Sequence, residues 1–128
     1  MPGITYDAGA LIAGSKNDRA LWALHRQALV RGLEVVVPTA VLAQVWRGGP
    51  RQTRLVQLLR GCGVEDLIEA NAKSIGLLAG RSEHTDVVDM SVVECALRRS
   101  HEAIATSDGD EIAALVATTG RPIRVYDV

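Results

Sequence analysis

The chain has 128 residues, a length that suits one domain with a single core. Hydrophobic residues make up 48% of it, which excludes a disordered protein, and no apolar run reaches the roughly eighteen residues that a membrane span needs. The formal net charge of −1 predicts neither nucleic-acid nor membrane binding. The first residues lack a basic region and an apolar signal segment, so we expect a cytoplasmic protein.

Short apolar segments alternate with segments of helical spacing along the whole chain. We expect strands at residues 4–7, 33–37, 64–67, 103–106 and 123–126. We expect helices at residues 8–14, 17–31, 39–46, 51–60, 71–80, 86–100 and 110–118. This alternation predicts a mostly parallel central sheet with helices on both faces. The expected fold class is therefore α/β, a three-layer α/β/α sandwich formed by one domain over residues 1–128.

Three acidic residues stand where such a sheet would end its strands. Asp7 follows the first strand, Asp108 lies two residues beyond the fourth, and Asp89 opens a helical stretch. Ligands of open parallel sheets bind outside the carboxyl ends of the strands. Each acid also has a simpler explanation, because an Asp before a helix commonly caps it. Asp108 and Glu111 have capping-box spacing, and Asp86 is placed to cap the helix that begins near Asp89.

If the fold brings Asp7, Asp89 and Asp108 within about 5 Å of one another, each pair repels by roughly 3 kcal/mol at an effective dielectric near 20. A divalent cation would relieve that repulsion, and oxygen ligands at a site open to water suit Mg²⁺ or Mn²⁺. Such an ion can activate water and stabilise charge on a phosphodiester. The acids therefore indicate hydrolysis of a nucleic-acid backbone.

Three stretches of the chain resemble motifs of the PIN-domain family, whose members include the VapC toxins of type II toxin–antitoxin pairs. They are ITYDAGALIA at residues 4–13, DVVDMSVVECA at 86–96 and IATSDGDEI at 104–112. The resemblance implies that Asp7, Asp89 and Asp108 are metal ligands and that Thr106 joins them as a catalytic residue.

The same resemblance implies a function and a set of partners. It implies an Mg²⁺- or Mn²⁺-dependent endoribonuclease that hydrolyses RNA and is held inactive by a cognate antitoxin. It also implies a homodimer with no membrane association.

The chain departs from the family pattern at one acidic position. The family has a Glu on the helix after the second strand, whereas the matching stretch PTAVLAQV at residues 38–45 has Gln44 there. An amide still offers an oxygen but removes a full charge. Asp86 or Asp110 could supply the missing charge. The alternative function is a weakened PIN-like module that binds RNA or an antitoxin without efficient turnover.

Basic residues gather in one part of the chain. No acid lies between Glu34 and Glu65, where Arg47, Arg51 and Arg54 form an RNA-binding candidate. The alternative for these arginines is a solvated helix face. The histidines His25, His84 and His101 are scattered and far from the motifs, so we expect surface or structural roles for them rather than catalytic ones. A phosphoacceptor receiver domain is disfavoured, because neither Lys16 nor Lys73 is placed for that site.

Overall fold

The computed structural model describes residues 2–84 and 86–128. Its strands are β1 (Gly3–Tyr6), β2 (Glu34–Pro38), β3 (Gly63–Glu65), β4 (Ala103–Thr106) and β5 (Arg124–Asp127). Its helices are α1 (Ala8–Ser15), α2 (Arg19–Val30), α3 (Thr39–Val45), the 3₁₀ turn η1 (Pro50–Gln52), α4 (Thr53–Leu59), α5 (Glu69–Ser82), α6 (Val87–Arg98) and α7 (Gly109–Ala117). Every expected strand and helix is present. None of the described helices is long and apolar enough to cross a membrane.

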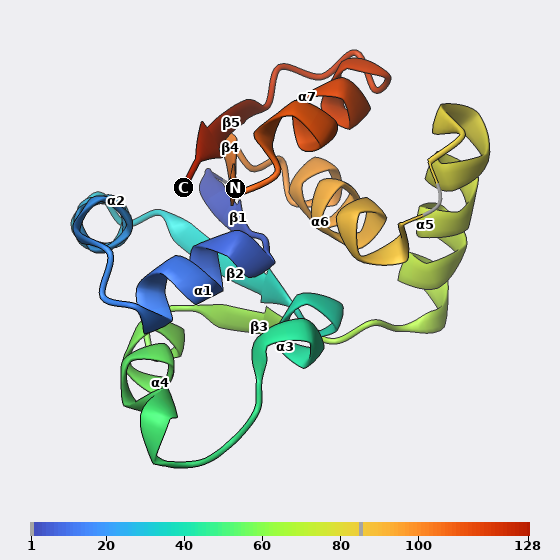
Figure 1. Cartoon of the computed structure of the whole chain (residues 1–128). Helices are drawn as coiled ribbons and strands as arrows, with labels where there is room; N and C mark the ends of the chain where they lie inside the picture. The colour runs from blue at the N-terminus through green and yellow to red at the C-terminus, as the bar shows by residue number, and fades with distance from the viewer. Residues whose placement is uncertain (1, 85) are drawn as a thin grey trace.

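The five strands form one parallel sheet in the order β3-β2-β1-β4-β5. The chain first adds strands on one side of β1 and then returns to add β4 and β5 on the other side. Because parallel crossovers are right-handed, this reversal sends the later helices to the opposite face. Figure 1 shows the result, with α1, α2 and α4 on one side of the sheet and α5, α6 and α7 on the other. The expected three-layer, PIN-like α/β/α architecture is confirmed.

The core is mostly aliphatic, as the absence of Phe requires. The central strands are buried throughout, which is why they read as continuous apolar runs rather than alternating ones. Tyr6 is the aromatic exception: it is fully buried and its hydroxyl lies 2.9 Å from Nδ1 of His25. Thr5, the residue before Tyr6 in β1, has its Oγ1 2.8 Å from Nδ1 of buried His101. These two histidines are structural, as expected.

Candidate active site

The candidate site lies at the carboxyl ends of β1 and β4, the two strands between which the order of the sheet reverses direction. β1 and β4 are neighbours, and their connections leave toward opposite sides of the sheet. The carboxyl ends of two such strands leave a crevice between the departing helices, which is the usual ligand position in open parallel sheets. Asp7 directly follows β1 and Thr106 ends β4, so the topology brings both to this crevice.

Asp7 is held in place through both carboxylate oxygens. Its Oδ1 accepts a 2.7 Å hydrogen bond from the backbone N–H of Ala8, and its Oδ2 accepts a 2.7 Å bond from Oγ1 of Thr106. The residue is only 5% exposed. Each carboxylate oxygen can accept more than one bond, so Asp7 caps α1 and retains lone pairs for a further partner.

Thr106 links Asp7 to Asp108. The fully buried Thr106 hydroxyl donates to Asp7 and accepts a 2.9 Å hydrogen bond from the backbone N–H of Asp108. Asp108 stands at the N-cap position of α7, but its side chain makes no capping bond and is exposed. The capping box expected for Asp108 and Glu111 is therefore wrong. The Asp108 carboxylate is therefore exposed to solvent, while its backbone N–H is bonded to the hydroxyl that contacts Asp7.

Asp89 is 7% exposed, in the first turn of α6. Its backbone N–H donates to Oδ1 of Asp86, which also accepts from Val88, so Asp86 caps the helix as expected. Burial is the largest cause that raises the pKa of the Asp89 carboxyl, and together with the charges of Asp86 and Asp7, and against the lowering effect of His84, it brings that pKa to about 6. Asp7 and Asp89 thus lie within each other's electrostatic field.

His84 and Glu111 join Asp89 in a group that the sequence did not predict. His84 Nε2 lies 3.2 Å from Oδ2 of Asp89. One ligand atom each from His84, Asp89 and Glu111 lies within 4.8 Å of the others, in the only such group of metal-binding side chains among residues 2–84 and 86–128. The expectation that His84 is far from the motifs is wrong.

The three acids expected to converge are therefore shared between two adjoining groups. Asp7 and Asp108 meet at Thr106, whereas Asp89 gathers with His84 and Glu111. The reason lies in α7, whose first turn carries Glu111 to Asp89 while the Asp108 side chain stays exposed. A single tight cluster of Asp7, Asp89 and Asp108 is not formed among the described residues.

The residues considered as replacements for a missing acid lie in different settings. Asp86 is exposed and occupied as a helix cap, although its charge reaches Asp89. Asp110 is exposed in the first turn of α7, and Gln44 is exposed near the end of α3. Gln44 thus presents its amide to solvent.

The arginines of the basic strip are all exposed. Arg47 follows α3, Arg51 lies in η1 and Arg54 lies in α4. A groove of about 310 Å³ lies beside them, between the loop after α3 and one face of α4, and Trp46 and Arg60 contribute to its lining. Trp46 is 46% exposed, so its ring is accessible at the edge of this groove.

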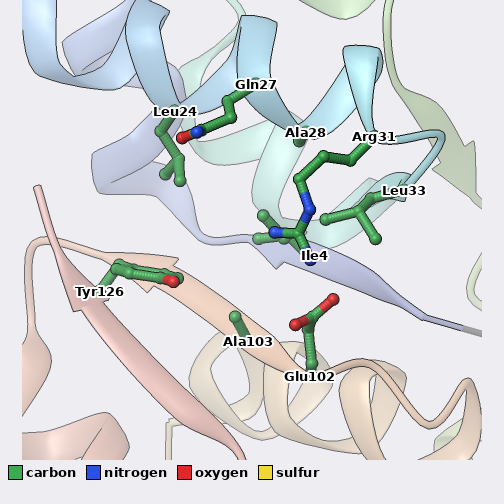
Figure 2. A pocket seen from close by; sticks show the side chains of 9 residues that line it. All are labelled: Ile4, Leu24, Gln27, Ala28, Arg31, Leu33, Glu102, Ala103 and Tyr126. Atoms are coloured by element: carbon green, nitrogen blue, oxygen red, sulfur yellow. The ribbon is translucent and has the colours of Figure 1, made fainter.

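A second cavity, of about 50 Å³, lies near the opposite edge of the sheet. Figure 2 shows the Arg31 guanidinium and the Glu102 carboxylate pointing toward one another across it, beside Tyr126. Its remaining lining comes largely from the amino ends of β1 and β4 and from α2. It is therefore separate from the acidic site, which lies at the carboxyl ends.

Comparison with solved structures gives matches that span nearly the whole chain. A chain in the crystal structure of VapBC2 from Rickettsia felis, bound to a DNA fragment from their promoter, is 12% identical, with a TM-score of 0.76 and coverage of 100% of this chain and 99% of that one. A chain of FitAcB from Neisseria gonorrhoeae is 13% identical, with a TM-score of 0.66 and coverage of 97% and 96%. The likeness is one of fold.

The comparisons do not assign the chain to a family. No family model matches the chain, and no curated protein matches it. At 12% and 13% identity, the structural likeness shows only a fold shared with chains of those assemblies. The assignment to the PIN-domain family as a VapC-type toxin is therefore wrong, because three short motifs do not define a family.

Proposed function

We propose that the protein is a divalent-metal-dependent ribonuclease that works as the nuclease component of a toxin–antitoxin pair. The observation that carries the proposal is the placement of buried Asp7 and Asp89 within each other's field at the reversal point of the sheet. Two buried carboxylates that repel each other favour a cation between or beside them. The donor atoms are mainly carboxylate oxygens, which suit Mg²⁺ or Mn²⁺.

Each residue has a defined task in this proposal. A bound divalent ion would lower the pKa of a coordinated water and stabilise negative charge on the phosphodiester. Asp7 and Asp89 would hold that ion, and Asp108 would complete the site from its solvent side. The Thr106 hydroxyl fixes the orientation of Asp7 through its 2.7 Å hydrogen bond. In the reaction a water oxygen bonds to phosphorus, one ester P–O bond breaks, and the departing ribose oxygen takes up a proton.

The RNA substrate would lie along the basic strip. Arg47, Arg51 and Arg54 are exposed on consecutive segments, and no acid opposes them between Glu34 and Glu65. Such a strip attracts phosphates without reading sequence. Trp46 offers a ring on which a base could stack.

The proposed partners follow from the solved assemblies that share this fold. VapBC2 and FitAcB are toxin–antitoxin assemblies, and we extend that pairing to a cognate antitoxin for this chain. We also propose that the chain forms a homodimer, which these assemblies do not test. Exposed apolar side chains at Leu67, Ile68 and Leu77 are consistent with a surface that a protein partner covers.

A second candidate function is a binding module that holds RNA or an antitoxin with little turnover. The exposed, uncharged Gln44 favours it, because the expected fourth acid is absent. The substitution Gln44→Glu separates the two candidates. Activity that appears only in the variant supports the binding module, and activity already present in the native protein supports the nuclease.

The main test is cleavage of RNA by the purified protein. We expect cleavage with Mg²⁺ or Mn²⁺, none with excess chelator, and loss of activity by at least about a hundredfold in Asp7→Asn, because removal of one charge-stabilising group has that effect. Glu102→Gln is the matched control, since it removes an exposed carboxylate beside the opposite end of β4. Cleavage that persists in chelator contradicts the proposal.

A further inference from the structure

We propose that His84, Asp89 and Glu111 form a mixed nitrogen and oxygen ligand set that makes the site prefer Mn²⁺ to Mg²⁺. This inference rests on the proposed function and specifies which ion the site takes. It assigns a metal-binding role to His84 and Glu111, two residues outside the acidic trio that the sequence indicated.

The geometry of the group is the first support. Its members come from three separate segments: His84 precedes α6, Asp89 lies in the first turn of α6, and Glu111 lies in the first turn of α7. The fold nevertheless brings one ligand atom of each within 4.8 Å of the others. Atoms at such mutual distances need to move little to reach a common ion, since metal–ligand bonds are about 2.0–2.2 Å long.

The three side chains range from buried to exposed, as the ligands of a metal site that is open to water on one side would. Asp89 is almost fully buried, and Asp86 fixes its helix by capping it. The His84 side chain is a quarter exposed, and Glu111 is exposed. A bound ion would therefore have protein on one side and water on the other, which leaves coordination positions for water and substrate oxygens.

The ligand types support a preference among ions. Mg²⁺ takes oxygen ligands almost exclusively, whereas imidazole nitrogen suits the first-row transition metals. Mn²⁺ accepts both carboxylate oxygen and imidazole nitrogen, so His84 adds affinity for Mn²⁺ that it does not add for Mg²⁺. Glu111 supplies a second carboxylate beside Asp89, which compensates for the neutral amide at Gln44.

The competing interpretation is that His84 is only a counter-ion for Asp89. The two residues form an ion pair at 3.2 Å when the imidazole is protonated. In that arrangement His84 competes with a metal ion, and its removal would leave Mn²⁺ binding unchanged or make it stronger. The two interpretations therefore predict opposite effects of the same substitution.

The experiment is electron paramagnetic resonance of the purified full-length protein loaded with Mn²⁺. Pulsed measurements detect a ¹⁴N nucleus bonded to the ion, and titration gives the affinity for Mn²⁺ and, by competition, for Mg²⁺. We expect a nitrogen signal in the native protein and its loss in His84→Ala. We also expect Mn²⁺ affinity to fall by about tenfold or more, a scale set by losses of even outer-shell partners.

Two further variants make the outcome specific. Glu111→Gln should weaken Mn²⁺ and Mg²⁺ binding alike, because both ions take carboxylate oxygen. Glu83→Gln is the matched control: it changes an exposed charge beside His84 without removing a ligand and should leave both affinities within about twofold. Circular dichroism checks that each variant is folded, and the absence of a nitrogen signal from the native protein rejects the inference even where a variant fails to fold.

The results that overturn the inference differ from those that overturn the proposed function. Mn²⁺ binding without a nitrogen signal, or with unchanged affinity in His84→Ala, rejects the role of His84 and leaves the ribonuclease proposal standing. If the native protein binds neither Mn²⁺ nor Mg²⁺, so that Asp89→Asn has no affinity to lose, both the inference and the ribonuclease proposal are rejected. A nitrogen signal that persists in His84→Ala also rejects the inference.

Discussion

Asp89 combines burial with poor neutralisation of its charge. It is 7% exposed, two other aspartates act on it, and its pKa is raised to about 6 by burial first and by those charges second. A folded-state pKa above the unfolded value means that the folded protein binds the proton more tightly. This contribution to stability is therefore present at low pH and is lost as pH rises through about 6.

The first prediction concerns the metal-free protein and Asp89→Asn. At pH 7.5 the variant should be more stable than the native protein by up to roughly 3 kcal/mol, because it removes a buried ionised group. The difference should shrink toward pH 4, where the Asp89 carboxyl of the folded native chain is protonated and therefore neutral, like the amide that replaces it. Urea unfolding in chelator at the two pH values measures it. A variant that is less stable at pH 7.5 would show that the Asp89 carboxylate stabilises the fold.

The second prediction concerns Thr106. Thr106→Val keeps the side-chain shape but removes the hydroxyl that donates to Asp7 and accepts from the Asp108 N–H. We expect a loss of about 1–3 kcal/mol in the free energy of unfolding, since the buried Asp7 carboxylate and the Asp108 N–H both lose a partner, together with a clear loss of RNA cleavage. Thr106→Ser, which retains the hydroxyl, should keep most of the activity. Equal activity in the Val and Ser variants would remove Thr106 from the positioning of Asp7.

The position of α1 depends on a close contact. A Cβ atom at Gly9 would lie 2.2 Å from Oγ and 2.5 Å from the backbone N of Ser107. Gly9 therefore lets the first turn of α1 rest directly on the segment after β4. That contact brings Asp7, at the start of α1, to Thr106 at the end of β4.

The third prediction tests this contact. Gly9→Ala should destabilise the protein by about 1–3 kcal/mol, because the new methyl group forces α1 away from Ser107, and it should reduce cleavage by misplacing Asp7. Gly76→Ala is the control, since α5 has open space there and alanine favours helix. Thermal unfolding compares the two variants. Equal stability of both would show that α1 tolerates a shift.

Most elements could be predicted from the sequence because their signals are local. Buried strands such as β2 and β4 are uninterrupted apolar runs, and helix ends coincide with residues such as Gly32 and Asp86. The helix α5 extends over Glu69–Ser82, beyond the expected 71–80 at both ends. Asp7 and Thr106 could be placed because strand ends share an edge in a parallel sheet.

The remainder of the site could not be predicted, because it depends on how helices meet. His84 lies five residues before Asp89 with no periodic relation to it, and Glu111 reaches Asp89 only through the packing of α7 on α6. Only the capping pattern singled out Glu111, and that expectation was wrong. The sequence also suggested a family through three short motifs, and no family model supports that assignment.

At the scale of the whole molecule, the acidic site and the basic strip lie in different parts of the fold. The acids gather where β1, β4, α6 and α7 meet, whereas the exposed arginines follow α3 and continue into α4. The net charge of −1 conceals this separation. An RNA strand held by the arginines would need to extend to the crevice beyond β1 and β4.

The fourth prediction follows from that arrangement. Replacing Arg51 and Arg54 by Ala should weaken RNA binding and lower the slope of log affinity against log salt by about 1.4, at about 0.7 for each lost phosphate contact on a single strand. Replacing Arg19 and Arg26 on α2 makes the same change in charge elsewhere and should leave the slope unchanged. Filter binding over a range of salt measures both slopes. Equal slopes in the two double variants would place the RNA elsewhere.

Anomalous diffraction from a crystal of the protein grown with Mn²⁺ tests most directly whether Asp89 and Asp7 bind a divalent cation. The arrangement of the carboxylates predicts a manganese peak within bonding distance of Asp89 and close to Asp7, which disappears in crystals of Asp89→Asn. A well-ordered crystal with no peak in this crevice, or a peak that survives in that variant, would contradict the claim.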